Sequence, residues 1–379
     1  MKLLNRIRIK GWKSVRDQIL ELGRINVLIG ANGAGKSNLI SFLRMLRFMA
    51  AGELQLHIAR SGGAETFLCY GSKNTRQLES TLVFDMNGST ETHYMRLEHA
   101  VPDTLIFAEE RVSSSPESHG TDFGSARKES GLSVSEVPAG LGIRQMMRQI
   151  RCFQFHDTSE TCRIRQNGYV EDNRCLRSDA GNLAAFLFML RETRPEYYRR
   201  IVATVRQAAP HFGDFDLELA RSNPRYVMLN WKESGADHLF GPHQLPDGLL
   251  RFVALATLLL QPEDDLPAVT VIDEPELGLH PFAVNILGAL IRKVSCHCQV
   301  VIATQSLNLL DQFGDQDIIV VQRRNSASEI SRLNPNEMGE WRREYSLSEM
   351  WEKNIIGGPP SACRCGRTDR RDFRAGYAF

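Results

Sequence analysis

The chain contains the octapeptide Gly30-Ala31-Asn32-Gly33-Ala34-Gly35-Lys36-Ser37, whose pattern GxxxxGK[ST] is typical of a loop that wraps nucleotide phosphates. Glycines let such a loop curl until successive N–H groups converge on phosphate oxygens. Lys36 is expected to reach the β and γ phosphates, and the Ser37 hydroxyl to bind Mg²⁺. The predicted binding set is Asn32, Gly33, Ala34, Gly35, Lys36, Ser37 and Asn38.

The residues on either side of this loop fit the same interpretation. Residues 25–29 form an apolar, β-branched run suited to a buried strand. The residues from Asn38 onward are typical of a helix, and the positive N-terminal end of a helix favours an anion. The sequence therefore predicts a phosphate-binding loop between a strand and a helix.

Composition limits the class of protein. The 379 residues are 42% hydrophobic, which is enough to bury a sizeable core. The net charge of +1 gives no whole-chain argument for binding nucleic acid or membrane. Residues 1–24 hold no apolar signal region, and the longest apolar run, residues 249–260, is too short to cross a bilayer. We expect a cytoplasmic protein without a membrane partner.

The eight cysteines are scattered and include no CxxC pair, so free thiols are expected. The alternative is a zinc site that combines Cys296 and Cys298 with Cys363 and Cys365, although these spacings are not those of a known structural site.

The first part of the chain is rich in strand signals. Three strands are expected within residues 4–29, and an antiparallel subdomain is expected from the segments 66–70, 78–85, 92–97 and 104–108. The turn that carries Lys13 is either an ordinary turn or a contact with the nucleotide. Residues 112–142 are rich in serine and glycine, which predicts a mobile loop.

Residues 144–206 hold twelve arginines and seven acidic residues and look helical from Asn182 onward. A solvated helix face and a DNA-binding surface both explain this composition. If the beginning of the segment is helical, Arg144, Arg148 and Arg151 share one face. Within the segment, residues 152–157 alternate between apolar and polar side chains from Phe153 to His156.

This alternation predicts that Phe153 and Phe155 face inward while Gln154 and His156 share the other face. We expect this polar pair, and His156 in particular, to lie where it can meet the nucleotide.

A second apolar run, residues 268–272, ends abruptly in Asp273-Glu274. Two carboxylates at the tip of a buried strand complement a phosphate loop, with Asp273 in the Mg²⁺ shell and Glu274 polarising the attacking water. A helix over 282–294 and a strand over 299–303 follow. Such alternation predicts an α/β fold with a mostly parallel sheet and ligands at the carboxyl ends of its strands.

Together these segments resemble the ABC-type ATPases of the RecF and SMC class, and most closely the compact branch known as AAA family ATPases. The resemblance rests on Lys10-Gly11-Trp12-Lys13-Ser14, the phosphate loop (Walker A), the signature position Leu245-Pro246-Asp247-Gly248, residues 271–274 (Walker B), the D-loop Glu276-Leu277-Gly278-Leu279-His280-Pro281, Thr304-Gln305-Ser306 at the switch-histidine position, and the closing segment 345–360.

The resemblance implies a fold and a division of the chain. It implies a single ATPase head over residues 1–360, with a mostly parallel core sheet, an antiparallel β subdomain and a helical subdomain. The expected parts are an N-terminal lobe (1–111), a flexible loop (112–142), a helical, arginine-rich insertion (143–240), a lobe with the signature, Walker B and switch motifs (241–335), a C-terminal segment (336–360) and a basic tail (361–379). Sustained heptads are absent between Lys36 and Leu245, so no coiled-coil arm is expected.

The resemblance also implies a mechanism. Two subunits sandwich two ATPs, so that Asp247 and Gly248 of one subunit face the γ-phosphate held by the other, and Gln305 joins Glu274 as a catalytic residue. Two positions depart from the usual pattern. Pro246 replaces the signature serine and lacks a hydroxyl and an N–H, and Gln305 cannot become a cation.

The implied function is an ATPase that binds ATP and Mg²⁺, dimerises with ATP, and acts in DNA repair and maintenance or in antiviral defence against phage, beside an effector encoded nearby. The alternative is a slow ATP-dependent switch or scaffold that gates a partner nuclease. DNA is a candidate partner in both.

Overall fold

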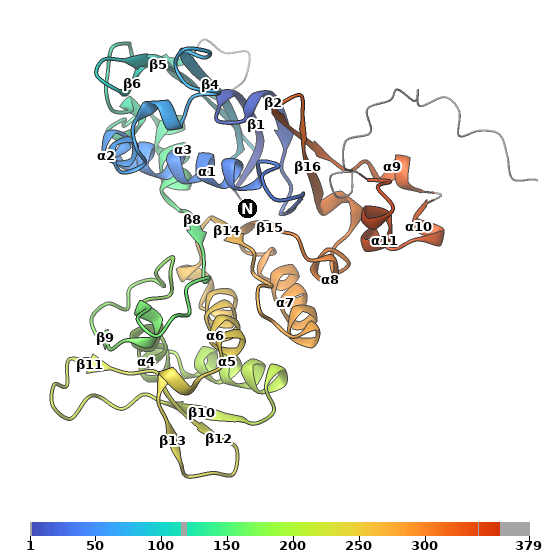
Figure 1. Ribbon diagram of the computed structural model, residues 1–379. Coiled ribbons are helices and arrows are strands. Elements are labelled where there is room, and N and C mark those ends of the chain that lie inside the picture. Colours follow the sequence, from blue (N-terminus) through green and yellow to red (C-terminus); the bar gives the residue numbers. More distant parts are fainter. Residues whose placement is uncertain (1, 115–119, 340, 357–379) are drawn as a thin grey trace, which may run out of the picture.

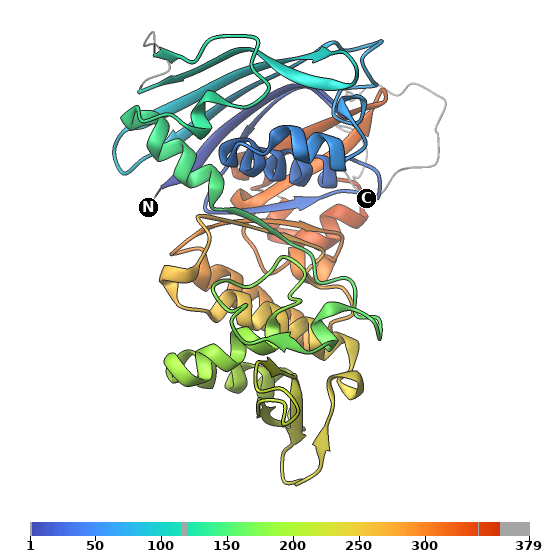
Figure 2. The same ribbon diagram turned by 90° about the vertical axis from the view of Figure 1, so that its left-hand side faces the viewer.

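The computed structural model of the protein describes residues 2–114, 120–339 and 341–356. An antiparallel sheet forms the upper part of the molecule, a second and mostly parallel sheet crosses the middle, and a lobe of helices and short hairpins forms the lower part (Figure 1 and Figure 2). The tail 361–379 lies outside the described residues.

The central sheet has the order β17-β16-β3-β15-β14-β8. Its strands are β3 (Ile25–Ile29), β8 (Ile150–Phe153), β14 (Val269–Asp273), β15 (Gln299–Thr304), β16 (Ile318–Arg324) and β17 (Ala327–Arg332). All neighbouring pairs are parallel except β16 with β17. The predicted mostly parallel core sheet is confirmed, and its carboxyl ends meet at one edge.

Each face of this sheet is buried, which explains the continuous apolar runs in its strands. Side chains alternate between two cores, so that Leu28 enters the upper core while Val27 and Ile29 enter the lower one. A strand whose two sides are both buried has no polar face to place in water.

The upper core lies between the central sheet and the antiparallel sheet, which has the order β2-β1-β4-β5-β6-β7. These strands are β1 (Leu3–Trp12), β2 (Val15–Glu21), β4 (Gln77–Asp85), β5 (Thr90–Ala100), β6 (Thr104–Ser113) and β7 (Thr121–Asp122). Helix α1 (Lys36–Ala51) fills the space between the two sheets, and α2 (Leu54–Arg60) and α3 (Pro138–Arg148) flank it. The predicted antiparallel subdomain is confirmed.

The lower core contains the helices α4 (Leu183–Thr193), α5 (Pro195–Ala208), α6 (Asp247–Leu260) and α7 (Pro281–Val294). Short strands complete this lobe: β9 (Gly168–Tyr169), β10 (Phe212–Asp216), β11 (Tyr226–Val227), β12 (Asn230–Glu233) and β13 (Leu239–Phe240). Helix α8 (Leu307–Leu310) lies between β15 and β16 in the chain, and the helices α9 (Pro335–Met338), α10 (Trp341–Glu344) and α11 (Leu347–Glu352) follow β17. In the described residues no helix exceeds the 16 residues of α1, as expected for a head without an arm.

Two local predictions are wrong. Residues 66–70 form no strand, because Ala64–Thr66 is a 3₁₀ turn and Phe67 packs edge-on against Trp12, with ring centroids 5.2 Å apart. The apolar side chains of Phe67, Leu68 and Cys69 are therefore buried although their backbone turns instead of forming a strand. The mobile loop predicted over 112–142 is also wrong for residues 120–142, which include β7, a 3₁₀ turn at Gly131–Ser133 and the first half of α3.

Buried polar contacts hold residues 120–142 in place. The carboxylate of Glu110 on β6 accepts hydrogen bonds from Ser130 and from the N–H of Gly131, and pairs with Arg127 at 3.0 Å. The fourth partner is His93, whose Nε2 lies 3.1 Å from Glu110 Oε1. The serine-rich composition of this segment does not reveal that Glu110, a buried carboxylate on β6, accepts its hydrogen bonds.

The predicted arginine face is also wrong. Helix α3 ends at Arg148, and Arg151 lies on β8 in the central sheet. Arg148 Nε donates to the carbonyl of Ala50 at 2.9 Å and Arg144 donates to Ser133, so both side chains are used to hold α3 in place. The inserted lobe accordingly begins after β8 rather than at residue 143, and its second half consists of the short strands β10 to β13 and the loops between them.

In the described part of the chain, no helix is long and apolar enough to span a membrane. The zinc alternative gains no support there. No metal-binding cluster of His, Cys, Asp and Glu occurs among the described residues, Cys298 is buried against Thr270, and Cys363 and Cys365 lie outside them.

Candidate nucleotide-binding site

The candidate site lies where four parallel strands end. The phosphate loop (residues 30–37) follows β3, Gln154 follows β8, Asp273 ends β14, and Gln305 follows β15. Because β8, β14, β15 and β3 are neighbours in this order, their ends bring these side chains to one edge. This edge is where ligands bind in open α/β sheets.

The phosphate loop has the backbone geometry that its glycines permit. Gly33 and Gly35 have φ angles of 75° and 120°, which L side chains rarely adopt. A Cβ on Gly35 would also lie 2.1 Å from the Oγ of Ser328. The glycines therefore serve both the curl of the loop and the close approach of β17.

Lys36 is buried, with 7% of its surface exposed. Its Nζ donates to the carbonyl of Gly30 and, at 3.2 Å, to that of Ala31. Burial lowers the pKa of Lys36, while the charges of Glu274, Asp273 and Glu276 oppose that shift. The ammonium is thus held within the loop and within the field of three carboxylates.

A series of side-chain hydrogen bonds supports the phosphate loop. Ser328 Oγ donates to the carbonyl of Ala34 at 2.6 Å and lies 2.6 Å from Ser14 Oγ, which accepts from Asn38 Nδ2 at 2.6 Å. Asn38 therefore braces the loop from α1. Sequence reasoning missed Ser328, which lies far along the chain and carries no motif.

Lys13 turns away from the loop. Its Nζ donates to Ser41 Oγ on α1 at 2.8 Å, and burial lowers its pKa. Of the two alternatives open for this turn, the structure places Ser14 beside the loop and Lys13 one helical turn beyond it.

Asp273 and Glu274 stand at the tip of β14 as predicted. Gln154 Nε2 donates to Asp273 Oδ2 at 2.8 Å, and His156 Nε2 lies 3.0 Å from the Asp273 carbonyl oxygen. The predicted polar pair therefore contacts the first carboxylate residue, Gln154 through the side chain and His156 through the backbone.

Gln305 connects the two halves of the site. Its Nε2 donates to Glu274 Oε1 at 2.7 Å and to Asn32 Oδ1 at 2.6 Å. One amide thus links the phosphate loop to the predicted base. Glu274 has a φ of 45°, an uncommon conformation for a residue with a side chain, which is fixed by its N–H to Ala303 at 2.8 Å.

A third carboxylate, Glu276, lies behind this pair. Its Oε1 accepts from Thr304 Oγ1 at 2.6 Å and from the Gln305 N–H at 3.3 Å, whereas its buried Oε2 has no hydrogen-bond partner in the part of the chain that the structure describes. Burial raises the pKa of Glu276, and the charge of Glu274 adds to the effect. It was placed in the D-loop from sequence without a contact role, and here it fixes the end of β15.

A cavity of about 440 Å³ adjoins the phosphate loop on its outer side, lined by Arg16, Cys69, Tyr70, Asn74, Thr75 and Ser326. Arg323 connects the cavity to the phosphate loop, because it lies 3.5 Å from the Gly33 carbonyl oxygen and 3.4 Å from the Tyr70 hydroxyl. These lining residues were not singled out from the sequence.

The signature segment begins α6 in the lower lobe. Pro246 is the N-cap of α6, and a Cβ on Gly248 would lie 2.3 Å from the carbonyl oxygen of Gly278. Asp247 pairs with Arg165 at 2.6 Å. Within one chain, Asp247 and Gly248 thus contact the lower lobe and the D-loop; their predicted contact is with the γ-phosphate held by a second subunit.

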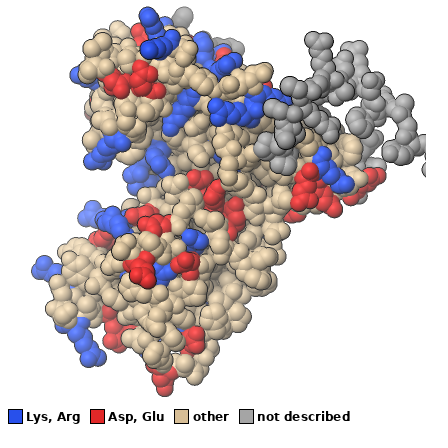
Figure 3. All heavy atoms as spheres, in the orientation of Figure 1, with Lys and Arg blue, Asp and Glu red and all other residues tan. Residues whose placement is uncertain are grey.

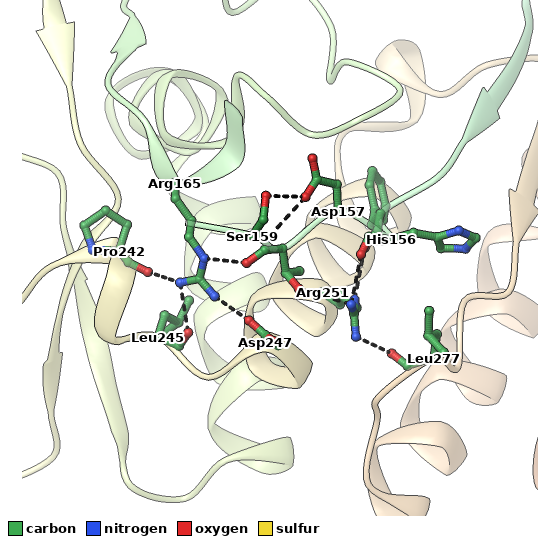
Figure 4. A network of polar contacts seen from close by, with 11 residues as sticks. His156, Asp157, Ser159, Arg165, Pro242, Leu245, Asp247, Arg251 and Leu277 are labelled. Atoms are coloured by element: carbon green, nitrogen blue, oxygen red, sulfur yellow. Dashed lines mark hydrogen bonds and ion pairs between the residues drawn. The ribbon is translucent and has the colours of Figure 1, made fainter. Parts of the chain in front are cut away.

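Two arginines connect this segment to residues 155–158, which follow β8 and Gln154 (Figure 4). Arg165 reaches the carbonyls of Pro242 and Leu245 on one side and that of Thr158 on the other. Arg251 donates to the His156 carbonyl at 2.9 Å and lies 3.4 Å from that of Leu277. The signature loop, the D-loop and residues 155–158 are therefore held as one unit.

Solved structures share this architecture. An SMC head bound to the C-terminal winged-helix domain of ScpA matches 88% of this chain and 99% of its own, with a TM-score of 0.59 and 16% identity. An SMC head with an extended coiled coil, in a complex with the C-terminal domain of ScpA derived from Pyrococcus furiosus, matches 91% and 99%, with a TM-score of 0.57 and 14% identity.

The SMC head domain from Thermotoga maritima matches 87% and 99%, with a TM-score of 0.50 and 15% identity. Identities this low establish the fold. No curated protein matches the sequence significantly.

A family model described as "AAA domain, putative AbiEii toxin, Type IV TA system" matches residues 25–144 and 177–311. These ranges contain the phosphate loop, the signature segment, Asp273, Glu274 and Gln305. The chain belongs to this AAA family, and its fold is the P-loop ATPase fold of SMC heads.

Proposed function

We propose that the protein binds ATP with Mg²⁺, hydrolyses it, and dimerises around it, in DNA repair and maintenance or antiviral defence and beside an effector protein. The observation that carries the proposal is the convergence of Lys36, Asp273 and Glu274 at one sheet edge, with Gln305 hydrogen-bonded to both the phosphate loop and Glu274.

Lys36 and the backbone of the phosphate loop hold the phosphates. Lys36 Nζ donates to two loop carbonyls, and a γ-phosphate would offer it charged acceptors in their place. The exchange is favourable because a phosphate oxygen carries a negative charge that attracts the partly desolvated ammonium, whereas a carbonyl oxygen is neutral.

The donor set fits Mg²⁺, which prefers oxygen ligands. The Ser37 hydroxyl at the start of α1 and the Asp273 carboxylate at the end of β14 would hold the ion, and Gln154 fixes the orientation of that carboxylate. When bound, the ion neutralises charge on the phosphates.

Glu274 is the proposed base. It polarises the attacking water, while Gln305 holds its carboxylate toward the phosphate loop. The positive φ of Glu274 directs the side chain out of the strand, and such strained residues gather at functional sites. The cavity beside Tyr70 is the proposed position of the adenine ring and ribose of ATP.

The placement of the signature segment at the start of α6 supports the proposed dimer. Asp247 and Gly248 lie at the start of α6 and contact Arg165 and Gly278 of their own chain. A second subunit, packed head to tail, would present this segment to the γ-phosphate and complete the site.

The second candidate function is a slow switch or scaffold whose ATP state gates a partner nuclease. Pro246 favours it, since the N-cap of α6 offers neither a hydroxyl nor an N–H to a phosphate. The neutral Gln305 at the switch position favours it as well, because it supplies no positive charge. Turnover measured with and without DNA separates the two functions.

The test compares wild type with Lys36→Ala and Glu274→Gln. Lys36→Ala is expected to abolish ATP binding in titration calorimetry, with Lys293→Ala on the exposed face of α7 as the matched control. Glu274→Gln is expected to bind ATP normally and to lose roughly 10²- to 10⁴-fold in hydrolysis. Wild-type affinity in the first variant, or wild-type turnover in the second, contradicts the assignment.

A further inference from the structure

A separate hollow lies between α1 and the loop that precedes α4. It consists of two adjoining cavities of about 310 and 260 Å³, which share Arg47, Cys152, Ser178 and Asp179. The upper wall is α1 and the lower wall is residues 175–179, so the hollow spans both lobes. Figure 3 shows Lys and Arg side chains gathered on both sides of the notch between the lobes.

The lining is strongly cationic. Its arginines are Arg44, Arg47, Arg151, Arg163 and Arg177, against one carboxylate, Asp179. Arg177 is already paired with Asp172 at 2.7 Å, and Arg163 lies 3.9 Å from Asp179.

The remaining three, Arg44, Arg47 and Arg151, are half-buried, and among the described residues they form no ion pair with a carboxylate. Burial lowers the pKa of Arg47, and the neighbouring charge of Arg151 lowers it further. Holding these three arginines together beside a single lining carboxylate, Asp179, is unfavourable, and an arginine cannot relieve the repulsion by losing its proton. Such a cluster is stabilised by an anion.

We propose that this hollow binds a ligand with two or more phosphate groups, at a site distinct from the phosphate loop. Guanidinium groups recognise phosphate through paired N–H donors. Phosphate is favoured over acidic side chains, because a hollow this small admits few carboxylates and each brings a single charge. A free polyphosphate or nucleotide and the backbone of a single-stranded nucleic acid share this chemistry.

The position of the hollow connects it to the ATPase site. Gln154 lines it, and the N–H of Gln154 donates to the Ser178 carbonyl at 2.9 Å, while its side chain donates to Asp273. A ligand that draws residues 175–179 toward α1 therefore acts on the residue that orients the proposed Mg²⁺ ligand. This coupling rests on the proposed function, whereas binding itself does not.

The test is a calorimetric titration of inorganic tripolyphosphate into the Lys36→Ala protein, in which the phosphate loop contributes least. Wild-type ATP binding by Lys36→Ala would contradict the proposed function alone. On this background, Arg47→Gln with Arg151→Gln is expected to weaken binding roughly tenfold or more, about 1.4 kcal/mol. The matched control, Arg199→Gln with Arg200→Gln, removes the same charge from the exposed face of α5 and leaves binding unchanged.

A second variant gives a result that misfolding cannot imitate. Asp179→Asn removes the one carboxylate of the lining but keeps the oxygen that accepts from the Gly181 N–H, so it is expected to tighten binding. An oligothymidylate and hexaglutamate are titrated in parallel. Binding of either phosphate ligand with this dependence on both variants supports the proposal and identifies the source. Hexaglutamate binding alone, no binding, or affinity indifferent to Asp179→Asn overturns it.

Discussion

The side-chain amide of Gln305 donates to the carboxylate of Glu274, with 2.7 Å between Nε2 and Oε1. The same nitrogen donates to Asn32 in the phosphate loop at 2.6 Å. A histidine here would place a cation beside the phosphates, whereas glutamine places a neutral donor. Gln305 is therefore positioned to orient the base.

Gln305→Ala is expected to lower ATP turnover by roughly tenfold to a hundredfold, because small displacements of a catalytic group are costly. ATP affinity should change little, since Lys36 and the loop backbone are untouched. Steady-state hydrolysis and titration calorimetry check the two quantities. Gln166→Ala, at an exposed position in the lower lobe, is the control. Equal turnover in Gln305→Ala and wild type would show that Glu274 is oriented by other contacts.

The central chemistry could be predicted from sequence because it is local. The phosphate loop and the Asp273-Glu274 pair each occupy consecutive residues after an apolar run, so one segment carries both the strand and its functional tip. Their meeting at one edge follows from parallel strands alone.

The residues that support the site could not be predicted, because they lie far from its motifs in the sequence and belong to no motif themselves. Ser328 braces Ala34, and Arg323 links Tyr70 to the loop. Likewise, the segment after β6 was expected to be mobile because its own residues bury little surface. Its order depends on Glu110, which no local pattern connects to Gly131.

Glu110→Gln tests that buried cluster. Breaking a buried ion pair costs about 3–5 kcal/mol, so we expect a lower melting temperature and faster hydrogen exchange over residues 120–135 at neutral pH. Glu109→Gln, on the same strand but partly exposed, is the control. Unchanged exchange in Glu110→Gln would mean that the segment is held by other contacts.

The same cluster has a pH dependence of known sign. Burial favours the neutral form of Glu110, but the hydrogen bond and charge of His93, with the donors Ser130 and Gly131, outweigh it and lower the pKa below the ordinary 4.5. A lowered pKa stabilises the fold above the unfolded value. The gap in melting temperature between wild type and Glu110→Gln should be full above pH 4.5 and shrink as pH falls through the lower, folded pKa.

Gly248→Ala tests the contact between the signature segment and the D-loop. An added Cβ would lie 2.3 Å from the Gly278 carbonyl oxygen, so backbone must shift, at a cost of about 1–3 kcal/mol. We expect a lower melting temperature by differential scanning fluorimetry. Gly241→Ala is the control, since a Cβ there meets nothing closer than 3.9 Å and its φ of −81° suits alanine. Equal melting temperatures for the two variants would contradict the close packing.

Pro246→Ser tests whether the signature segment meets a phosphate across the proposed dimer. Pro246 caps α6 with φ −56° and ψ 141°, a conformation that serine adopts readily, and its carbonyl accepts from the Leu250 N–H at 2.9 Å. A serine cap stabilises a helix by about 1 kcal/mol. Losing proline frees the unfolded chain and costs about 0.4–1 kcal/mol.

These two effects nearly cancel, so Pro246→Ser should melt close to wild type while regaining a hydroxyl and an N–H at the signature position. If that position faces a γ-phosphate held by a second subunit, turnover or ATP-dependent dimerisation should rise, as followed by phosphate release and by light scattering. Pro246→Ala separates the two donors, because it restores the N–H but not the hydroxyl. A fall in both turnover and dimerisation in Pro246→Ser would mean that the segment works as a proline cap, and that the proposed contact across the dimer does not use this position.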